Sequence, residues 1–269
     1  MSANGENRSG PNAGAGSALV VRPPGTIGAI SFVNFAPQPP YDERLIFWEG
    51  RNLDTAAAFR LLRQRLIDRG DPRIVLCTSA ERGEGKTTLA TNLALAFAEL
   101  GKYRVLLIET SFRSAAVGEV FGFKPPAGFA GQLARHRVRR DDPWVVVQIA
   151  GSPLYVMAAE PRCCASCAAV LAEEAKFCGM CGKETDLNDG GAIDAVTFAA
   201  AIGQFRESFH YLVLDAPPVL ASGDVNLIQD SADAIVFATR KGRSAARSLR
   251  RAIEQVAPAP VAAVVLMEN

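Results

Sequence analysis

Short apolar runs alternate with amphipathic segments along most of this chain of 269 residues. Each run carries few polar residues, as expected of strands that are buried on both faces of a sheet. The predicted strands are residues 74–78, 105–109, 145–149, 154–158, 211–215, 234–238 and 261–266. Helical periodicity is present at residues 53–67, 87–100, 128–137, 192–208 and 244–257. Strands that alternate with helices predict an α/β fold, in which a mostly parallel sheet is covered by helices on both faces.

The N-terminal segment differs in composition from the rest of the chain. It is rich in Gly, Asn, Ser, Ala and Pro, which bury little apolar surface, and we predict a mostly disordered tail over residues 1–50. A short apolar patch at residues 27–35 is a candidate for docking onto a partner or onto the domain itself. The remainder is predicted to be one domain, residues 51–160 and 185–269, interrupted by a cysteine-containing insert at residues 161–184.

Composition and charge narrow the classes of function. Hydrophobic residues make up 49% of the chain and the net charge is +1, so no nucleic-acid partner is expected. No apolar run reaches the roughly 18 residues of a transmembrane helix, and the N-terminus lacks the pattern of a signal peptide. We therefore expect a cytoplasmic protein, in which the six cysteines are metal ligands or buried thiols rather than disulfides.

A glycine-rich segment, AERGEGKTT at residues 80–88, follows the first predicted strand and opens a helix. The backbone N–H groups of such a turn form an anion-binding nest, and the helix N-terminus adds its positive dipole end. The usual phosphate-loop (P-loop) pattern is G-x-x-x-x-G-K-S/T; Ala80 replaces its first glycine, while Gly83 and Gly85 keep the tight part of the turn. A turn that merely caps a helix would not need the Lys-Thr pair, so the segment predicts nucleotide binding.

The predicted ligand is a nucleotide with Mg²⁺. Lys86 can reach the β- and γ-phosphates, and the Thr87 hydroxyl can ligate Mg²⁺. A second metal ligand is Asp215, which ends the apolar run YLVLD at residues 211–215, although acids also end strands at ordinary turns. The predicted cofactor-binding set is Gly83, Glu84, Gly85, Lys86, Thr87 and Thr88.

Several motifs together resemble one known family, the bacterial tyrosine kinases or BY-kinases, which are related to the MinD and ParA ATPases. They are TSAERGEGKTT at 78–88, NLALAFA at 92–98, LLIETSFR at 106–113, FG at 121–122 and LDAPPV at 214–219. The resemblance implies a P-loop NTPase fold, an ATP·Mg²⁺ site and autophosphorylation of a tyrosine-rich C-terminal tail. It also implies a membrane-embedded partner of the polysaccharide co-polymerase type, which recruits the kinase to the inner face of the plasma membrane.

The resemblance assigns catalytic roles to four residues, Lys86, Glu109, Arg113 and Asp215. The middle motif of the family carries two Asp residues, and here Glu109 and Ser111 stand in their places. Glu109 moves its carboxylate outward by one methylene, and Ser111 has none. A displacement of about 1 Å can cost on the order of 10²-fold in rate, so the sequence predicts a weakened kinase, unless Glu109 simply replaces Asp as the base.

Two further departures concern the acceptor and the assembly. The four tyrosines are scattered, and no tyrosine cluster precedes Asn269, so we expect the usual phosphate acceptor to be absent. The segment AAFRLLR at residues 57–63 resembles the family's ring-forming motif, E-x-x-R-x-x-R, but Ala57 occupies the position of its Glu. Assembly into a homo-oligomer remains an expectation from the resemblance.

Three functions are compatible with these motifs. The first is an ATP-dependent tyrosine kinase, with a weakened catalytic motif, that regulates capsular or exopolysaccharide biosynthesis or export. The second is a catalytically degenerate switch or adaptor that binds ATP in the same system. The third is a ParA/MinD-like positioning ATPase, which Glu81 disfavours because it stands where those ATPases carry a signature Lys.

The insert contains two C-x-x-C pairs that are ten residues apart. Two such knuckles supply four thiolates in a tetrahedron, which predicts a structural Zn²⁺ site, with iron as the lesser option. The predicted ligands are Cys164, Cys167, Cys178 and Cys181, and Cys163 is spare or replaces Cys164. We therefore expect a small zinc ribbon beside the nucleotide site or a subunit interface, and we hypothesise that it docks a partner.

Overall fold

The computed structural model describes residues 19–21, 30–48, 52–164, 166–167, 169, 171, 175–185 and 193–268. Its strands are β1 (Leu19–Val21), β2 (Ile30–Phe35), β3 (Ile74–Ser79), β4 (Val105–Glu109), β5 (Trp144–Ile149), β6 (Leu154–Met157), β7 (Tyr211–Asp215), β8 (Ala234–Arg240) and β9 (Val261–Met267). Within these described residues, the nine strands form one sheet in the order β1-β2-β5-β6-β4-β7-β3-β8-β9. All pairings except β1 with β2 and β5 with β6 are parallel. The predicted mostly parallel α/β sheet is therefore confirmed.

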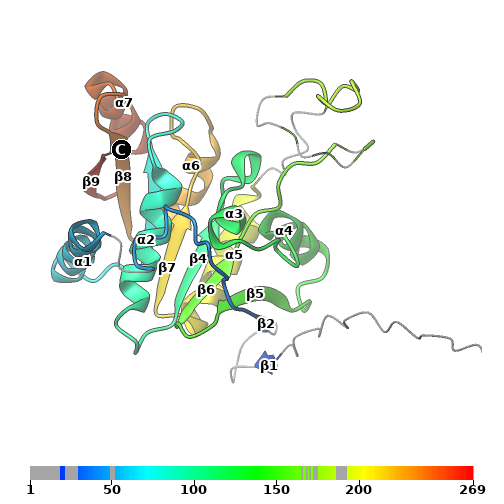
Figure 1. The fold of residues 1–269 in the computed structure, drawn as a ribbon, viewed down its shortest axis with the longest axis horizontal. Helices are drawn as coiled ribbons and strands as arrows, with labels where there is room; N and C mark the ends of the chain where they lie inside the picture. Colours follow the sequence, from blue (N-terminus) through cyan, green and yellow to red (C-terminus); the bar gives the residue numbers. More distant parts are fainter. Residues whose placement is uncertain are drawn as a thin grey trace, which may run out of the picture.

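Helices cover both faces of this sheet (Figure 1). They are α1 (Leu53–Asp68), α2 (Lys86–Ala98), α3 (Val117–Phe121), α4 (Phe129–Val138), α5 (Ala195–Ser208), α6 (Asp224–Ile228) and α7 (Ala246–Val256), with short 3-10 turns at η1 (Phe112–Ser114) and η2 (Gln229–Ser231). The buried side chains of α1, α2 and α3 join one hydrophobic cluster, and those of α4 to α7 join another. No helix among the described residues has the length and apolar character needed to cross a membrane.

The central strands divide their side chains between the two clusters. In β3, Ile74 and Leu76 belong to one cluster, while Val75 and Cys77 belong to the other. All six residues of β3 are buried, as are all five of β4 and of β7. Because successive side chains of a strand point to opposite faces, a strand covered on both faces must be apolar throughout. This explains why these strands were predicted within one residue of their ends.

The structure corrects the expectation of a mostly disordered tail for residues 30–48. Residues 30–35 form β2, which lies parallel to β5, and both Ile30 and Phe32 are buried. Further along, Leu45 joins the hydrophobic cluster beneath α1 and α2. Over residues 30–35, the apolar patch that was a candidate for docking onto the domain itself is this strand, while residues 27–29 lie outside the described residues. The patch was not predicted as a strand because Gly and Pro surround it and β5 lies more than a hundred residues away. The rest of the predicted tail, apart from β1, lies outside the described residues.

One aromatic cage helps to hold β2 against the sheet. The guanidinium carbon of Arg104 lies 5.1 Å, 4.9 Å and 5.1 Å from the ring centroids of Phe32, Tyr155 and Phe209. An arginine over aromatic faces is stabilised by their negative π-density. The edge of the sheet is thus fixed by side chains from β2, β6 and the end of α5.

Other differences from the sequence prediction are local. The short helices α3 and α6 were not predicted, because five residues are too few to show a helical period. Helix α5 begins at Ala195 rather than at residue 192, where the Asp194 carboxylate caps it by accepting the Thr197 N–H at 2.8 Å.

Candidate functional site

The predicted site residues meet at one edge of the sheet. Strands β3, β4 and β7 are parallel neighbours, so their carboxyl ends lie together. The glycine-rich loop follows β3, Glu109 ends β4, and Asp215 ends β7. In the register of the sheet, Glu109 lies beside Asp215, and Asp215 beside Cys77. Residues far apart in the sequence are therefore brought to one place by strand order alone.

Backbone geometry explains the two glycines of the loop. Gly83 and Gly85 have φ angles of 75° and 93°, a left-handed conformation that side chains rarely adopt. Gly85 is also the N-cap of α2, and its carbonyl accepts the Leu89 N–H at 2.8 Å. A Cβ at Gly85 would lie 3.1 Å from the Met267 Cγ. Because glycine offers no capping side chain, the first N–H groups of α2 remain available to an anion.

The Glu84 side chain supports the loop from inside. It is 2% exposed, and its Oε2 accepts the Glu81 N–H at 2.8 Å. The Ser79 hydroxyl donates to the Glu81 carbonyl at 2.7 Å. Glu84 was predicted to belong to the nucleotide-binding set, and its carboxylate accepts a backbone N–H of the same turn.

Asp215 and Thr87 form the polar centre of the site. The Thr87 Oγ1 donates to the Asp215 Oδ2 at 2.8 Å. Burial raises the pKa of Asp215, while the charge of Lys86 and the Thr87 hydrogen bond lower it. The other carboxylate oxygen, Oδ1, is buried and has no hydrogen-bond partner among the described residues. A hydroxyl beside a buried, half-satisfied carboxylate fits the oxygen ligands that Mg²⁺ prefers.

The Glu109 carboxylate is held by backbone N–H groups. Its Oε1 accepts from Ala116 at 2.5 Å and Val117 at 3.0 Å, and its Oε2 accepts from Ala159 at 2.8 Å. Burial and the charge of Asp215 raise its pKa to about 7, against the three N–H bonds, which lower it. The longer side chain thus connects the end of β4 to the start of α3 and to the segment after β6.

The remaining two positions of the middle motif offer no second carboxylate. The Ser111 Oγ lies 3.2 Å from the Ser114 Oγ. Arg113, which the resemblance made catalytic, is exposed on η1. Of the four predicted catalytic residues, the structure brings Lys86, Glu109 and Asp215 to the sheet edge and leaves Arg113 on the adjoining turn.

Sequence reasoning missed the connection between β8 and α7, which contacts the loop. The Arg240 Nη1 donates to the Gly83 carbonyl at 3.2 Å, and the Ser248 hydroxyl donates to the Glu81 Oε1 at 2.6 Å. The only signal for these contacts is strand order, since β8 pairs directly with β3. Nothing in the local sequence marks them.

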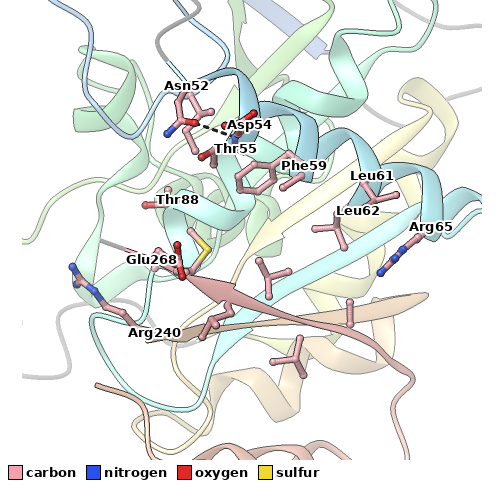
Figure 2. Close-up of a pocket in the computed structure, with 18 of the residues that line it drawn as sticks. Asn52, Asp54, Thr55, Phe59, Leu61, Leu62, Arg65, Thr88, Arg240 and Glu268 are labelled. Atoms are coloured by element: carbon pink, nitrogen blue, oxygen red, sulfur yellow. Dashed lines mark hydrogen bonds between the residues drawn. The ribbon is translucent and has the colours of Figure 1, made fainter. Parts of the chain in front are cut away.

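A groove of about 1140 Å³ runs between α1 and β9 and reaches the loop. Figure 2 shows Thr88, Arg240 and Glu268 together at one end, with Leu61, Leu62 and Arg65 toward the other. Phe59 lies between the two ends. The groove therefore has a polar end beside the first turn of α2 and an apolar length along α1.

The four cysteines of the insert converge. The Sγ atoms of Cys164, Cys167, Cys178 and Cys181 all lie within 4.8 Å of one another. Cys164 and Cys178 are buried, and backbone N–H groups lower the pKa of both thiols, that of Cys164 to about 6. The pKa of Cys167 is instead raised, to about 12. Four thiols at this spacing, two of which are biased toward thiolate, can hold a metal ion. The exposed Cys163 donates instead to the Pro161 carbonyl at 3.5 Å, so it does not replace Cys164.

The insert is connected to the sheet edge by a short stem, residues 158–162. The Ala158 carbonyl accepts the Phe129 N–H at 3.1 Å, and the Glu160 Oε1 accepts the Gly128 N–H at 2.9 Å. A Cβ at Gly128 would lie 2.4 Å from the Glu160 Cγ, so this position requires glycine. The residue between them, Ala159, is the one that donates to Glu109. The stem therefore contacts both α4 and the site.

Sequence comparison finds relatives among bacterial tyrosine kinases. Tyrosine-protein kinase CpsD of Streptococcus pneumoniae serotype 4 is 24% identical over 184 residues, which are 68% of this chain and 70% of that protein. Tyrosine-protein kinase YwqD of Bacillus subtilis strain 168 is 28% identical over 184 residues, 68% of this chain and 66% of that protein. No family model matches the chain.

Structure comparison finds the same fold. The chimerical protein CapA2B2 has a TM-score of 0.65 at 18% identity and covers 87% of this chain and 93% of its own. The kinase domain of the Escherichia coli tyrosine kinase ETK has a TM-score of 0.63 at 16% identity, with 86% and 82% covered. MinD complexed with Mg-ADP from Pyrococcus horikoshii OT3 has a TM-score of 0.51 at 17% identity, with 72% and 68% covered. The predicted resemblance to the BY-kinases is confirmed in sequence and in fold.

Proposed function

We propose that this chain, which resembles the bacterial tyrosine kinases in sequence and in fold, is an ATP-binding protein of the BY-kinase type. In this proposal it regulates the biosynthesis or export of a capsular polysaccharide or exopolysaccharide. One observation carries the proposal: the P-loop places Lys86 and Thr87 against the buried carboxylate of Asp215. The relatives are named tyrosine-protein kinases, which supports an enzyme rather than a binding module.

The loop and helix residues would hold the nucleotide. The N–H groups of the loop and of the first turn of α2 would bind the phosphates, and Lys86 would neutralise their charge. Thr87 Oγ1 and Asp215 Oδ1 would hold Mg²⁺, which supplies charge neutralisation for phosphoryl transfer. Thr88 lies at the polar end of the groove, which gives the rest of the nucleotide a bounded space beside α2.

Two observations favour slow phosphoryl transfer or none. Three backbone N–H groups engage the Glu109 carboxylate, so it must give up hydrogen bonds to accept a proton from an acceptor hydroxyl. Ser111 supplies no second carboxylate. A pKa near 7 nevertheless suits a general base. The second candidate function is therefore a nucleotide-dependent switch or adaptor in the same system, and a MinD-like ATPase is the third.

The proposed partner is a membrane-embedded protein of the polysaccharide co-polymerase type, which would recruit the chain to the inner face of the plasma membrane. If the chain forms a homo-oligomer through α1, the contacts between subunits would differ from those that the family motif makes. Arg60 binds Glu99 of the same chain through Nε and Nη2 at 2.5 to 3.0 Å, and the Arg63 Nη1 donates to the Ala96 carbonyl at 2.5 Å. Ala57 offers no acid to a neighbour.

We propose that the cysteine cluster holds a structural Zn²⁺ and forms a zinc ribbon within residues 161–184. Four thiol ligands leave no open position for catalysis, so the metal would fold the insert. Phe177 and Met180, on the second knuckle, are 62% and 79% exposed. Exposed apolar side chains on a metal-supported knuckle support a partner-docking role for the insert.

The test is to incubate the purified protein with labelled ATP and Mg²⁺ and to follow ADP and phosphoprotein together. Lys86→Ala should abolish nucleotide binding and turnover, whereas Lys124→Ala, an exposed lysine away from the loop, should change neither. Phosphotyrosine that depends on Lys86 establishes the kinase. Binding of ATP with neither product establishes the switch, and ADP without phosphotyrosine supports the MinD-like ATPase. Failure of the wild-type protein to bind ATP would contradict all three.

A further inference from the structure

Two arginines from outside the P-loop motif contact the loop at Gly83. A Cβ at Gly83 would lie 3.0 Å from the Nη1 of Arg243 and 3.1 Å from both its Cζ and its Nη2. Three atoms at nearly equal distances mean that the face of the guanidinium covers the position that a Cβ of residue 83 would occupy. From the same connection, the Arg240 Nη1 donates to the Gly83 carbonyl at 3.2 Å. One glycine of the loop is therefore covered by two cationic side chains.

The turn that carries these arginines is fixed by its own hydrogen bonds. The Ser244 Oγ accepts the Arg240 N–H at 2.7 Å, and the Arg240 carbonyl accepts the N–H groups of Arg243 at 3.2 Å and Ser244 at 2.9 Å. Gly242 provides the left-handed residue, with φ of 73°. On the far side of the turn, the Ser248 hydroxyl binds Glu81 of the loop at 2.6 Å. A turn stabilised by hydrogen bonds therefore positions Arg243 against the loop.

The carboxylates of Glu81 and Glu84 in the loop bind groups other than Arg243. The Glu81 Oε1 accepts from Ser248, and the buried Glu84 accepts the Glu81 N–H inside the turn. Arg243 itself is exposed to solvent on its outer side. A planar guanidinium matches the oxygens of a phosphate through two parallel N–H donors. Because Arg243 lies over the phosphate-binding loop, its charge would lie beside the phosphate groups, which carry most of the negative charge of a nucleotide.

We propose that Arg243 binds the polyphosphate of a nucleoside triphosphate, and that Arg240 is a positioning residue which fixes the Gly83 carbonyl beneath it. This inference rests on the proposed function, because it concerns the same nucleotide site. It adds a ligand that lies in the β8–α7 connection, about 160 residues beyond the P-loop motif. Affinity then depends on the number of phosphates that Arg243 can reach.

The experiment compares dissociation constants for Mg·ATP, Mg·ADP and AMP by titration calorimetry. Arg243→Gln keeps a side chain that can cover Gly83 and removes the charge, whereas Arg243→Lys keeps the charge and loses the planar fork. Arg250→Gln, an exposed arginine on α7, is the matched control. We expect Arg243→Gln to weaken the binding of ATP about tenfold or more, to weaken the binding of ADP by a smaller factor, and to leave the binding of AMP unchanged. Arg243→Lys should fall between wild type and Arg243→Gln, and Arg250→Gln should match wild type.

Two results with the Arg243→Gln variant would overturn the inference. Unchanged ATP affinity in Arg243→Gln excludes a phosphate contact. Equal weakening of ATP, ADP and AMP means that Arg243 only shapes the loop, and a lowered melting temperature of Arg243→Gln without nucleotide supports that structural role. Loss of binding in Lys86→Ala with normal binding in Arg243→Gln refutes the inference and leaves the proposed function intact, whereas a wild-type protein that binds no nucleotide refutes both.

Discussion

Glu109 gives the sharpest prediction of the structure, because a single buried carboxylate connects three backbone segments. The substitution Glu109→Gln keeps the shape of the side chain and replaces one oxygen by an NH₂ group. Oε1 can still serve Ala116 and Val117, so the NH₂ group would face the Ala159 N–H, which now lies 2.8 Å from Oε2. Two donors would then point at each other in a fully buried place.

The expected loss of stability follows from one hydrogen bond and one unsatisfied donor. A buried donor left without its acceptor costs about 1–3 kcal/mol. For a chain of this size, each kcal/mol lowers the melting temperature by roughly 2–4 °C. We therefore expect Glu109→Gln to lose about 1–3 kcal/mol of unfolding free energy at pH 5.

The loss should shrink as pH rises. Burial and the Asp215 charge raise the Glu109 pKa from its ordinary 4.5 to about 7 in the folded protein. The folded state therefore holds this proton more tightly than the unfolded state, and wild-type stability falls as pH rises from about 4.5 to about 7. Gln has no such titration.

The assay is urea unfolding of both proteins at pH 5 and pH 8. Glu119→Gln serves as the control, because Glu119 is 75% exposed and makes only a surface ion pair with Arg44; it should change stability by less than about 1 kcal/mol. Glu109→Gln that is as stable as wild type at pH 5 would refute the three-bond geometry. A difference in stability that widens toward pH 8 would instead refute the raised pKa of Glu109.

Two further predictions concern the stem and the insert. Gly128→Ala should lower the free energy of unfolding by about 1–3 kcal/mol in a thermal melt, because the new Cβ would displace the Glu160 side chain. The control is Gly131→Ala, which should be neutral or stabilising because no atom lies within 4 Å of the new Cβ. Equal effects at both glycines would disprove the packing argument. Cys178→Ser should abolish the single bound metal that we expect per chain in elemental analysis, while Cys163→Ser should retain it, and metal retained by Cys178→Ser would contradict the four-thiol site.

Much of the site was predictable because its residues are adjacent in sequence or sit at the ends of uniformly apolar strands. The Lys86-Thr87 pair follows β3 directly, and Asp215 ends β7, so local patterns marked both. The spacing of the cysteine pairs likewise predicted a cluster, which the structure shows within 4.8 Å. In each case the reactive residues lie a few positions apart or at the end of a strand. The order of the parallel strands is then sufficient to bring the strand ends together.

The amino-acid sequence by itself determined the α/β architecture, the glycine-rich loop between β3 and α2, and the cysteine cluster, since these depend on short-range pattern and residue type. Tertiary structure alone decided where side chains point. The extra methylene of Glu109 carries its carboxylate to N–H groups of residues 116, 117 and 159, and Arg243 reaches Gly83 only because β8 pairs with β3. Even β2 became a strand only beside β5. Contacts of this kind join residues distant along the chain, so no local pattern contains them.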